Sequence, residues 1–413
     1  MQAYDLVIVG GGVGGTALGG VLARAGLEVL IVERETEFVD RVRGEWIAPW
    51  GVAEVKRVGL YDRFVAAGGH HLARHIAFDE MVPPEMAAEN PLPIGALVPG
   101  IPGPLCLEHV TLQNEALEQA VEAGAEFLRG VTAVQVTAGE QPRVRFTHES
   151  EDREVSCRLI VGADGRSSTV RRQLGLELVE DPVDHLIAGL LIDGANGWPD
   201  DLQAGGKVGD INYLIFPQGG GKIRLYADYD AAERGRFGGE GGAERMLAAF
   251  DMPCVPLSGA IAGAHPIGPC RSYPSSDSWL EGPPYVPGAV LMGDAAGYND
   301  PINGQGVSVT MRDARILGEL LLEDHDWRSE VFAPYAEERR ERMRRLRAAA
   351  LFATALNARF GLEDLERRRC AIERIRDDPL CMMPLISVMV GPEAVEAKYF
   401  EDSFRESVFA VPT

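Results

Sequence analysis

The chain has 413 residues, of which 46% are apolar and 25% charged, a composition typical of a globular protein with a large core and about two domains. Its formal net charge of -22 opposes binding to a phosphate backbone, so we expect no nucleic-acid partner. The apolar residues 380–390 are too few to span a bilayer, and a strand begins too early for a signal peptide. We therefore expect no transmembrane segment and a cytoplasmic location, with the six cysteines reduced.

A strand, a glycine-rich turn and a small-residue helix open the chain within residues 5–26. Gly10 permits a tight turn, Gly12 lets a pyrophosphate approach the backbone, and Gly15 lets the helix pack closely on the strand. The N-terminus of the helix offers N–H groups and positive dipole to phosphates. This pattern predicts a dinucleotide site, and the alternative is an ordinary crossover between two parallel strands.

A second buried strand is predicted over residues 29–32 and ends at Glu33, whose carboxylate is placed to hold a ribose hydroxyl. The following segment is too polar and too rich in Gly and Pro for a core strand, so we expect a loop there. Arg41 or Arg43 in this loop is a candidate to bind the pyrophosphate through two hydrogen bonds, and a surface position is the alternative for each.

Two later motifs each place an aspartate at the end of an apolar run. The first spans residues 159–171 and contains Asp164, and the second spans residues 290–297 and contains Asp294. Each carboxylate is placed to accept hydrogen bonds from ribityl or ribose hydroxyls, while turn formation or helix capping is the alternative role. A helix then begins after residues 300–306, and its N-terminus would stabilise negative charge on a bound ring.

These three motifs, in this order over most of the chain, resemble the FAD-dependent monooxygenases of the aromatic-hydroxylase type and their relatives. The resemblance implies an α/β fold with a Rossmann-like FAD-binding domain, an interleaved β-sheet substrate domain and a helical C-terminus. We expect the FAD-binding domain to comprise residues 1–67, 105–179 and 280–325, the substrate domain residues 68–104 and 180–279, and the helical region residues 326–413.

By the same resemblance, NADH or NADPH reduces FAD transiently, O2 adds at the flavin C4a, and the hydroperoxide transfers oxygen to an aromatic or olefinic small molecule. The protein then binds and orients the substrate and excludes water. The expected FAD-binding residues are Gly10, Gly12, Gly15, Glu33, Arg41, Arg43, Asp164, Gly293, Asp294, Pro301, Gly304, Gln305 and Gly306.

A predicted hairpin over residues 211–227 is expected to cover the flavin ring and form the substrate wall. No catalytic base is identified. The candidate pocket residues are Trp46, Tyr213, Phe216 and His265, each with a structural role as the alternative.

The one dense histidine cluster is His70, His71 and His75. No cysteine completes a site there, so a surface or pocket-lining role is expected and no metal.

A long helix is predicted from Tyr335 to Phe360, and residues 361–413 either cap the substrate pocket or form a homodimer contact. Glutamates alternate with arginines on this helix, which is typical of a solvated face. The arginines concerned are Arg339, Arg340, Arg342, Arg344, Arg345 and Arg347.

Three alternatives to a monooxygenase stay open. Gly44-Glu45 also resembles flavin halogenases, but no lysine stands where that family requires one. Gly297 resembles geranylgeranyl reductases, whereas residues 304–306 resemble the hydroxylases. The third alternative, from another class, is a non-enzymatic flavin-binding sensor. One departure from the hydroxylases is Asn114, which stands where they commonly carry an arginine that contacts the flavin.

Overall fold

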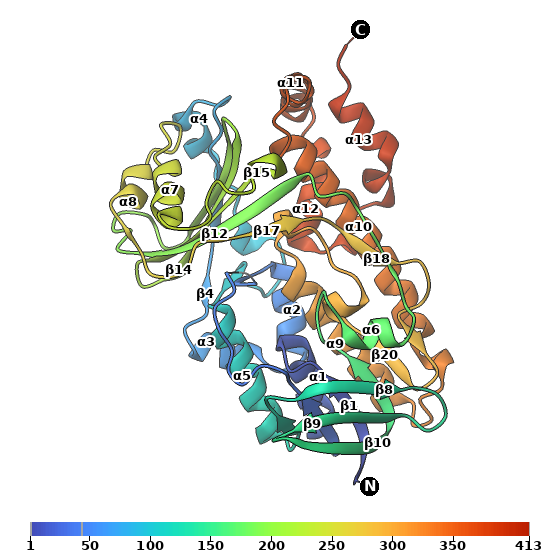
Figure 1. The fold of residues 1–413 in the computed structure, drawn as a ribbon. Coiled ribbons are helices and arrows are strands. Elements are labelled where there is room, and N and C mark those ends of the chain that lie inside the picture. The colour runs from blue at the N-terminus through green and yellow to red at the C-terminus, as the bar shows by residue number, and fades with distance from the viewer. Residues whose placement is uncertain (1, 43, 413) are drawn as a thin grey trace.

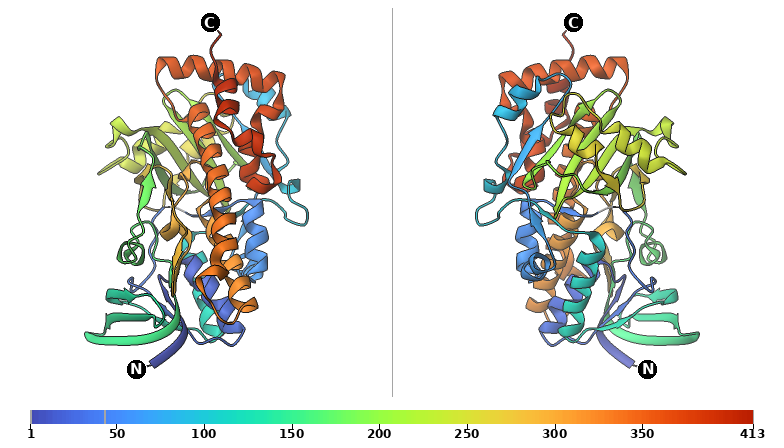
Figure 2. Two further views of the ribbon diagram at one scale, coloured as in Figure 1. Left: turned by 90° about the vertical axis from the view of Figure 1, so that its right-hand side faces the viewer. Right: turned by 90° about the vertical axis from the view of Figure 1, so that its left-hand side faces the viewer.

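The computed structural model describes residues 2–42 and 44–412, and it contains two large β-sheets joined by helices (Figure 1). One sheet lies near the N-terminus of the chain, and the other lies beside the helices α4 (Pro84–Glu89), α7 (Gly242–Ala249) and α8 (Ser258–Ala262). In Figure 2, one long C-terminal helix runs from the level of the first sheet to that of the second, and the helices after it gather at the end of the molecule near the C-terminus. Each sheet buries its apolar faces against other elements. A cavity lies where the two sheets and the C-terminal helices meet.

The first sheet has eight strands, and its central five, in the order β20-β10-β1-β2-β7, are parallel. These central strands are short, β-branched and buried, as expected of a parallel sheet covered on both faces. They are β1 (Gln2–Val9), β2 (Val29–Val32), β7 (Glu126–Leu128), β10 (Glu151–Gly162) and β20 (Ala289–Leu291). The antiparallel strands at its edges are β8 (Thr132–Thr137), β9 (Arg143–His148) and β19 (Tyr285–Val286).

One face of this sheet is covered by helices that share a single apolar core. Small residues let α1 lie against the sheet and against its neighbours, because Gly19 and Gly20 approach Ile31 and Ala120 closely. The helices of this layer are α1 (Val13–Arg24), α2 (Pro49–Arg57), α3 (Tyr61–Ala66), α5 (His109–Glu122) and α9 (Gly306–Glu323). The carboxyl ends of the parallel strands therefore face the cavity from one side.

The second sheet has seven strands, and its side chains alternate between two environments. Ile211, Tyr213 and Ile215 face an apolar core that includes α7 (Gly242–Ala249) and α8 (Ser258–Ala262). Leu214 and Phe216 face the opposite way, toward the cavity. The strands are β5 (Arg74–Ala77), β12 (His185–Asp193), β13 (Leu202–Val208), β14 (Ile211–Gly219), β15 (Lys222–Asp230), β16 (His265–Pro266) and β17 (Arg271–Ser275).

Smaller elements connect these layers. A three-stranded sheet pairs β3 (Trp46–Ile47) and β4 (His70–His71) with β6 (Leu105–Cys106), and β11 (Leu178–Glu180) pairs with β18 (Ser278–Leu280). Two short helices are α4 (Pro84–Glu89) and α6 (Thr169–Gln173).

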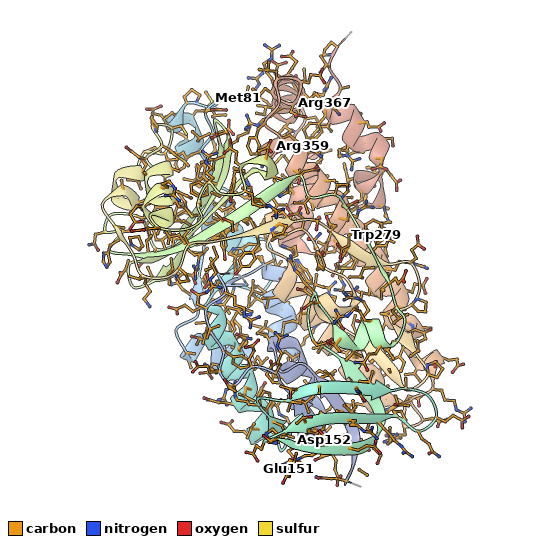
Figure 3. All side chains as sticks on the ribbon, viewed as in Figure 1. Met81, Glu151, Asp152, Trp279, Arg359 and Arg367 are labelled. Atoms are coloured by element: carbon orange, nitrogen blue, oxygen red, sulfur yellow. The ribbon has the colours of Figure 1, made fainter. Side chains whose placement is uncertain are left out.

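The C-terminal region is helical, as the sequence predicts, and consists of α10 (Ala333–Asn357), α11 (Leu362–Asp377), α12 (Met383–Val390) and α13 (Asp402–Phe409). Figure 3 shows Arg359 and Arg367 at the end of the molecule where Met81 also lies, while Glu151 and Asp152 lie at the opposite end. No helix among the described residues has both the length and the apolar character to cross a membrane. All six cysteines are free.

The predicted α/β fold class is confirmed. The domain boundaries stay a proposal. The second sheet is built from β5 and the strands from β12 to β17, which lie within the residues proposed for the substrate domain.

Candidate functional site

The glycine turn after β1 lies at one end of a cavity of about 1080 Å³. Gly10 has a φ of +110°, and a Cβ there would lie 2.3 Å from the carbonyl oxygen of Ala163, which follows β10. A Cβ on Gly15 would lie 2.0 Å from the carbonyl oxygen of Gly10. At Gly12, which lines the cavity, a Cβ would meet no atom within 4 Å. The turn is thus close-packed behind and open in front, as a bound pyrophosphate requires.

Glu33 lies at the end of β2 and lines the cavity. Its carboxylate accepts hydrogen bonds from the backbone N–H groups of Gly11 (2.7 Å) and Glu35 (2.8 Å), which fix the side chain beside the turn. Arg41 also lines the cavity and donates to the carboxylate of Glu35 at 2.7 Å. A carboxylate and an arginine thus flank the turn at this end of the cavity. Arg43, the other predicted arginine, lies outside the described residues.

Asp164 lines the cavity, but its carboxylate is already engaged by the start of α6. It accepts hydrogen bonds from the backbone N–H groups of Thr169 (2.6 Å) and Val170 (3.1 Å) and from the hydroxyl of Ser168 (2.5 Å). The capping role, which the sequence left as the alternative, is therefore present in the structure. Capping of this kind orients the loop, and it leaves fewer lone pairs for a ligand.

Asp294 has a more open environment than Asp164. Its side chain lines the cavity, is about one-third exposed (34%) and lies 3.6 Å from Nε of Arg166. Arg166 also lines the cavity, and its Nε is buried without a hydrogen-bond partner. The sequence motif contained Arg166 directly after Asp164-Gly165, but the residue was not singled out as a candidate.

Further buried polar atoms in the cavity wall have no partner within the described residues. They include Oδ1 of Asn299 and Nδ2 of Asn303. A buried polar atom without a partner costs free energy unless water or a ligand binds it. Together with the open Gly12 and Asp294, these atoms fit a large polar dinucleotide such as FAD.

The loop that carries Asp294 is held from behind by a buried ion-pair cluster. Asp313 of α9 accepts a hydrogen bond from the N–H of Gly293 (2.8 Å) and pairs with Arg339 (3.0 Å) and Arg342 (2.6 Å) of α10. Arg339 also donates to three carbonyl oxygens of the loop 293–297 at 2.8–2.9 Å. Although burial opposes it, the two arginines lower the pKa of Asp313. The prediction of a solvated arginine face was therefore wrong for Arg339 and Arg342.

The N-terminus of α9 faces the cavity beside this loop. Gly304 adopts a φ of +65°, and a Cβ on Gly306 would meet no atom within 4 Å. The amide of Gln305 is buried and accepts a hydrogen bond from Nε1 of Trp50 at 2.8 Å, which fixes the first turn. Pro301, Gly304, Gln305 and Gly306 all line the cavity. The positive end of this 18-residue helix thus faces the cavity.

The cavity continues away from the glycine turn into a second part, which we call the outer chamber: the lining residues within 75–82, 203–216 and 353–389. Its wall is mostly apolar and includes Leu214, Phe216, Ile372 and Leu385. Residues of α10, α11 and α12 line it, so part of the segment 361–413 closes the chamber, one of the two roles that the sequence left open.

Two of the four predicted pocket residues line the cavity. Trp46 and Phe216 do so, with their rings stacked at a centroid distance of 5.8 Å. Tyr213 does not, because neighbouring side chains on a strand point to opposite faces: it is fully buried in the core of the second sheet, and its hydroxyl donates to the carbonyl oxygen of Phe78 at 2.7 Å. His265 lies exposed on β16 at the edge of that sheet, away from the cavity.

The structure also places Asn114 and the three histidines. Asn114, where the hydroxylases commonly carry an arginine, is exposed, and the preceding residue, Gln113, lines the cavity instead. The histidine cluster separates: His71 binds the hydroxyl of Tyr61 (3.0 Å), whereas His75 lines the outer chamber. Within residues 2–42 and 44–412, no group of three or more His, Cys, Asp or Glu side chains is placed to hold a metal ion.

Comparison with known proteins agrees with this geometry. Residues 3–198 match the family model described as the FAD binding domain. The chain is 27% identical to digeranylgeranylglycerophospholipid reductase 2 of Methanothermobacter thermautotrophicus over 344 residues, or 78% of each protein. It is 25% identical to rifampicin monooxygenase of Streptomyces venezuelae over 337 residues, or 79% of this chain and 66% of that protein.

Among solved structures, the chain is similar in fold to OxyS anhydrotetracycline hydroxylase from Streptomyces rimosus. The TM-score is 0.70 and the identity 24%, over 94% of this chain and 76% of that one. The geometry of the cavity and the match to the FAD binding domain therefore both point to FAD. The chain is a flavoprotein oxidoreductase with an FAD-binding domain over residues 3–198, and it is similar in sequence to reductases and monooxygenases.

Proposed function

We propose that the protein is an NADH- or NADPH-driven monooxygenase that inserts one oxygen atom from O2 into an aromatic or olefinic small molecule. The observation that carries this proposal is the continuous cavity that joins the dinucleotide turn to an apolar chamber. FAD, when bound, supplies the activation of O2. The residues of the chain bind FAD, orient the substrate and exclude water.

The cofactor assignment within this proposal rests on particular contacts. Gly10, Gly12 and Gly15 shape a turn that would accept the pyrophosphate, and Glu33, which is held beside this turn, would bind a ribose hydroxyl. Asp294 and Arg166 both line the cavity, and we assign them to the ribityl chain of FAD. We add Arg166 to the predicted FAD-binding residues, because its Nε makes no hydrogen bond within the described residues and could donate one to FAD.

A flavin-dependent reductase of the geranylgeranyl type is the second candidate, because a reductase of that class is among the relatives and an apolar chamber also suits a prenyl chain. A halogenase is less well supported. By the resemblance, a halogenase requires a lysine beside its substrate. None of the four lysines, Lys56, Lys207, Lys222 and Lys398, lines the cavity.

Isotope labelling separates these activities. Purified holoprotein with NADH or NADPH is supplied with heavy O2 and a panel of phenols, polycyclic ketones and a geranylgeranyl lipid. A product that contains one heavy oxygen atom, formed only in the presence of O2, supports the monooxygenase. A product that gains two hydrogens under anaerobic conditions supports the reductase instead, and donor oxidation unaffected by every compound contradicts both and favours the sensor.

The cytoplasmic location, the transient binding of the nicotinamide donor and a homodimer remain predictions of the sequence. NADH and NADPH are compared in the same assay by the donor concentration that gives half-maximal oxidation.

A further inference from the structure

The charges of the outer chamber cancel within its own wall. Among the described residues that line it, the charged side chains are Asp79 and Arg368, and these two pair with each other. Arg368 also donates to the carbonyl oxygen of Leu356 (2.7 Å) and contacts Sδ of Met81 (2.9 Å), so each of its three nitrogens has a partner within the wall. A charged group on a substrate would lose its hydration here without gaining a partner, which favours a neutral ligand.

A chain of hydrogen bonds fixes the one histidine of this wall. Nε1 of Trp46 donates to Oε1 of Gln203 at 3.0 Å, and the other end of the same amide lies 3.2 Å from Nδ1 of His75. An indole N–H can only donate, so the oxygen of Gln203 must face Trp46 and its NH2 group must face His75. Nδ1 of His75 is therefore an acceptor.

The proton of the neutral ring follows from this pairing. Burial lowers the pKa of His75 to about 4, so the imidazole is neutral at physiological pH. A neutral imidazole carries one N–H, and because Nδ1 accepts from Gln203, that proton is on Nε2. Because His75 lines the outer chamber and Gln203 occupies its Nδ1, the Nε2–H is the donor that this ring can offer to a ligand there.

We propose that Nε2–H of His75 binds the carbonyl or phenolic oxygen of a neutral, mainly apolar substrate in the outer chamber, and that Trp46 and Gln203 set the tautomer that makes this possible. The proposal rests on the proposed function, since it assigns the substrate class of the same cavity. Leu214, Phe216, Ile372 and Leu385 contact the apolar body of the ligand, and the hydrogen bond orients it.

The tautomer is measured directly by NMR of histidine labelled with nitrogen-15 in the FAD-bound protein, without any substrate. The signals of His75, assigned by their loss in His75→Phe, are expected to show the proton on Nε2 at neutral pH. In Gln203→Met, which keeps the volume but removes the amide, the ring is expected to populate both tautomers. A proton on Nδ1 in the wild-type protein would overturn the assignment.

Binding is measured with fluorenone, fluorene and fluorene carboxylate, through the change that each causes in the visible absorbance of bound FAD. Fluorenone is expected to bind at least tenfold more tightly than the carboxylate. His75→Phe is expected to weaken fluorenone about tenfold, the loss of one hydrogen bond, and to leave fluorene within twofold. The infrared C=O band of bound fluorenone is expected at a lower frequency in the wild-type protein than in His75→Phe.

His70→Phe is the matched control, because His70 binds the carbonyl oxygen of Asp200 (2.7 Å) outside the cavity, and it is expected to leave all three affinities unchanged. Equal weakening of fluorenone and fluorene in His75→Phe, equal binding of ketone and carboxylate, or no binding of fluorenone would overturn the proposal. None of these measurements requires turnover, so failure of the oxygen-labelling assay alone would refute the monooxygenase and not the role of His75.

Discussion

Asp294 and Asp164 occupy equivalent places in two sequence motifs. The carboxylate of Asp164 accepts three hydrogen bonds from the protein, whereas that of Asp294 is left with more lone pairs for a ligand. That of Asp294 is open to the cavity, so Asp294→Ala is expected to release FAD, with a dissociation constant raised tenfold to a hundredfold by the loss of charge-assisted hydrogen bonds. The ratio of flavin absorbance to protein after gel filtration measures the effect. Full retention of FAD would show that Asp294 does not hold the cofactor.

Asp164→Ala provides the comparison for this prediction. Because that carboxylate caps α6, the expected loss is about 1–2 kcal/mol of unfolding free energy, measured on the apoprotein by denaturant titration. Asp251→Ala, at an exposed position, serves as the control and should change neither quantity.

Asp277 gives a pH dependence whose sign is fixed by burial. Desolvation, followed by repulsion from Asp300, raises the pKa of Asp277 to about 7. Hydrogen bonds from Asn299 (2.6 Å) and from the N–H of Asp300 (3.1 Å) lower this pKa and offset part of the rise. A carboxyl whose folded pKa is raised binds its proton more tightly in the folded state. Its ionisation therefore destabilises the fold increasingly as pH rises from about 4 to about 7.

Asp277→Asn keeps both accepted hydrogen bonds and removes the charge. We expect it to raise the unfolding free energy by about 1–3 kcal/mol at pH 8 and to change it little at pH 4. Thermal unfolding of the wild-type protein and the variant across this range tests the prediction. A variant that is destabilised at pH 8 would mean that the ionised carboxylate is needed there.

At the scale of elements, α10 supports the cofactor loop through Arg339. Arg339→Met leaves Asp313 with one buried partner fewer and three loop carbonyl groups without their donor. We expect a loss of about 3–5 kcal/mol in unfolding free energy together with weaker FAD binding. Arg340→Met, one residue further along the same helix and exposed, is the control and should behave as wild type in both measurements.

Elements with local signals were predictable from the sequence, and elements set by distant contacts were not. The turn at Gly10–Gly15 was predictable because its backbone needs glycine, and the strand ends followed from apolar runs. The strand from Ile211 to Phe216 is apolar on both faces, so its pattern did not reveal that Tyr213 and Phe216 point apart. Arg342 looked solvated because Asp313, its buried partner, lies on another helix.

At the scale of the whole molecule, one buried ion pair joins the second sheet to the segment that follows β2. Arg224 of β15 in the second sheet binds Glu45 with two hydrogen bonds and reaches Asp40 at 3.2 Å, and both acids lie in the segment that follows β2. Neither Arg224 nor Glu45 is exposed. Burial raises the pKa of Glu45, and Arg224 offsets part of this shift. The second sheet is therefore held to the segment that follows β2, at the edge of the cavity, by the Arg224–Glu45 ion pair, which is buried from water.

Removing one partner should cost more than removing both. Arg224→Met leaves a carboxylate buried without its cation, so we expect a loss of about 3–5 kcal/mol at pH 8. Since a raised folded pKa makes ionisation of Glu45 the source of this cost, the loss should shrink as pH falls toward the ordinary pKa of a glutamate. The double variant Arg224→Met/Glu45→Gln should recover part of the stability at pH 8. Denaturant unfolding of the four proteins at pH 5 and pH 8 measures these terms, and a double variant as unstable as Arg224→Met at pH 8 would refute an electrostatic origin.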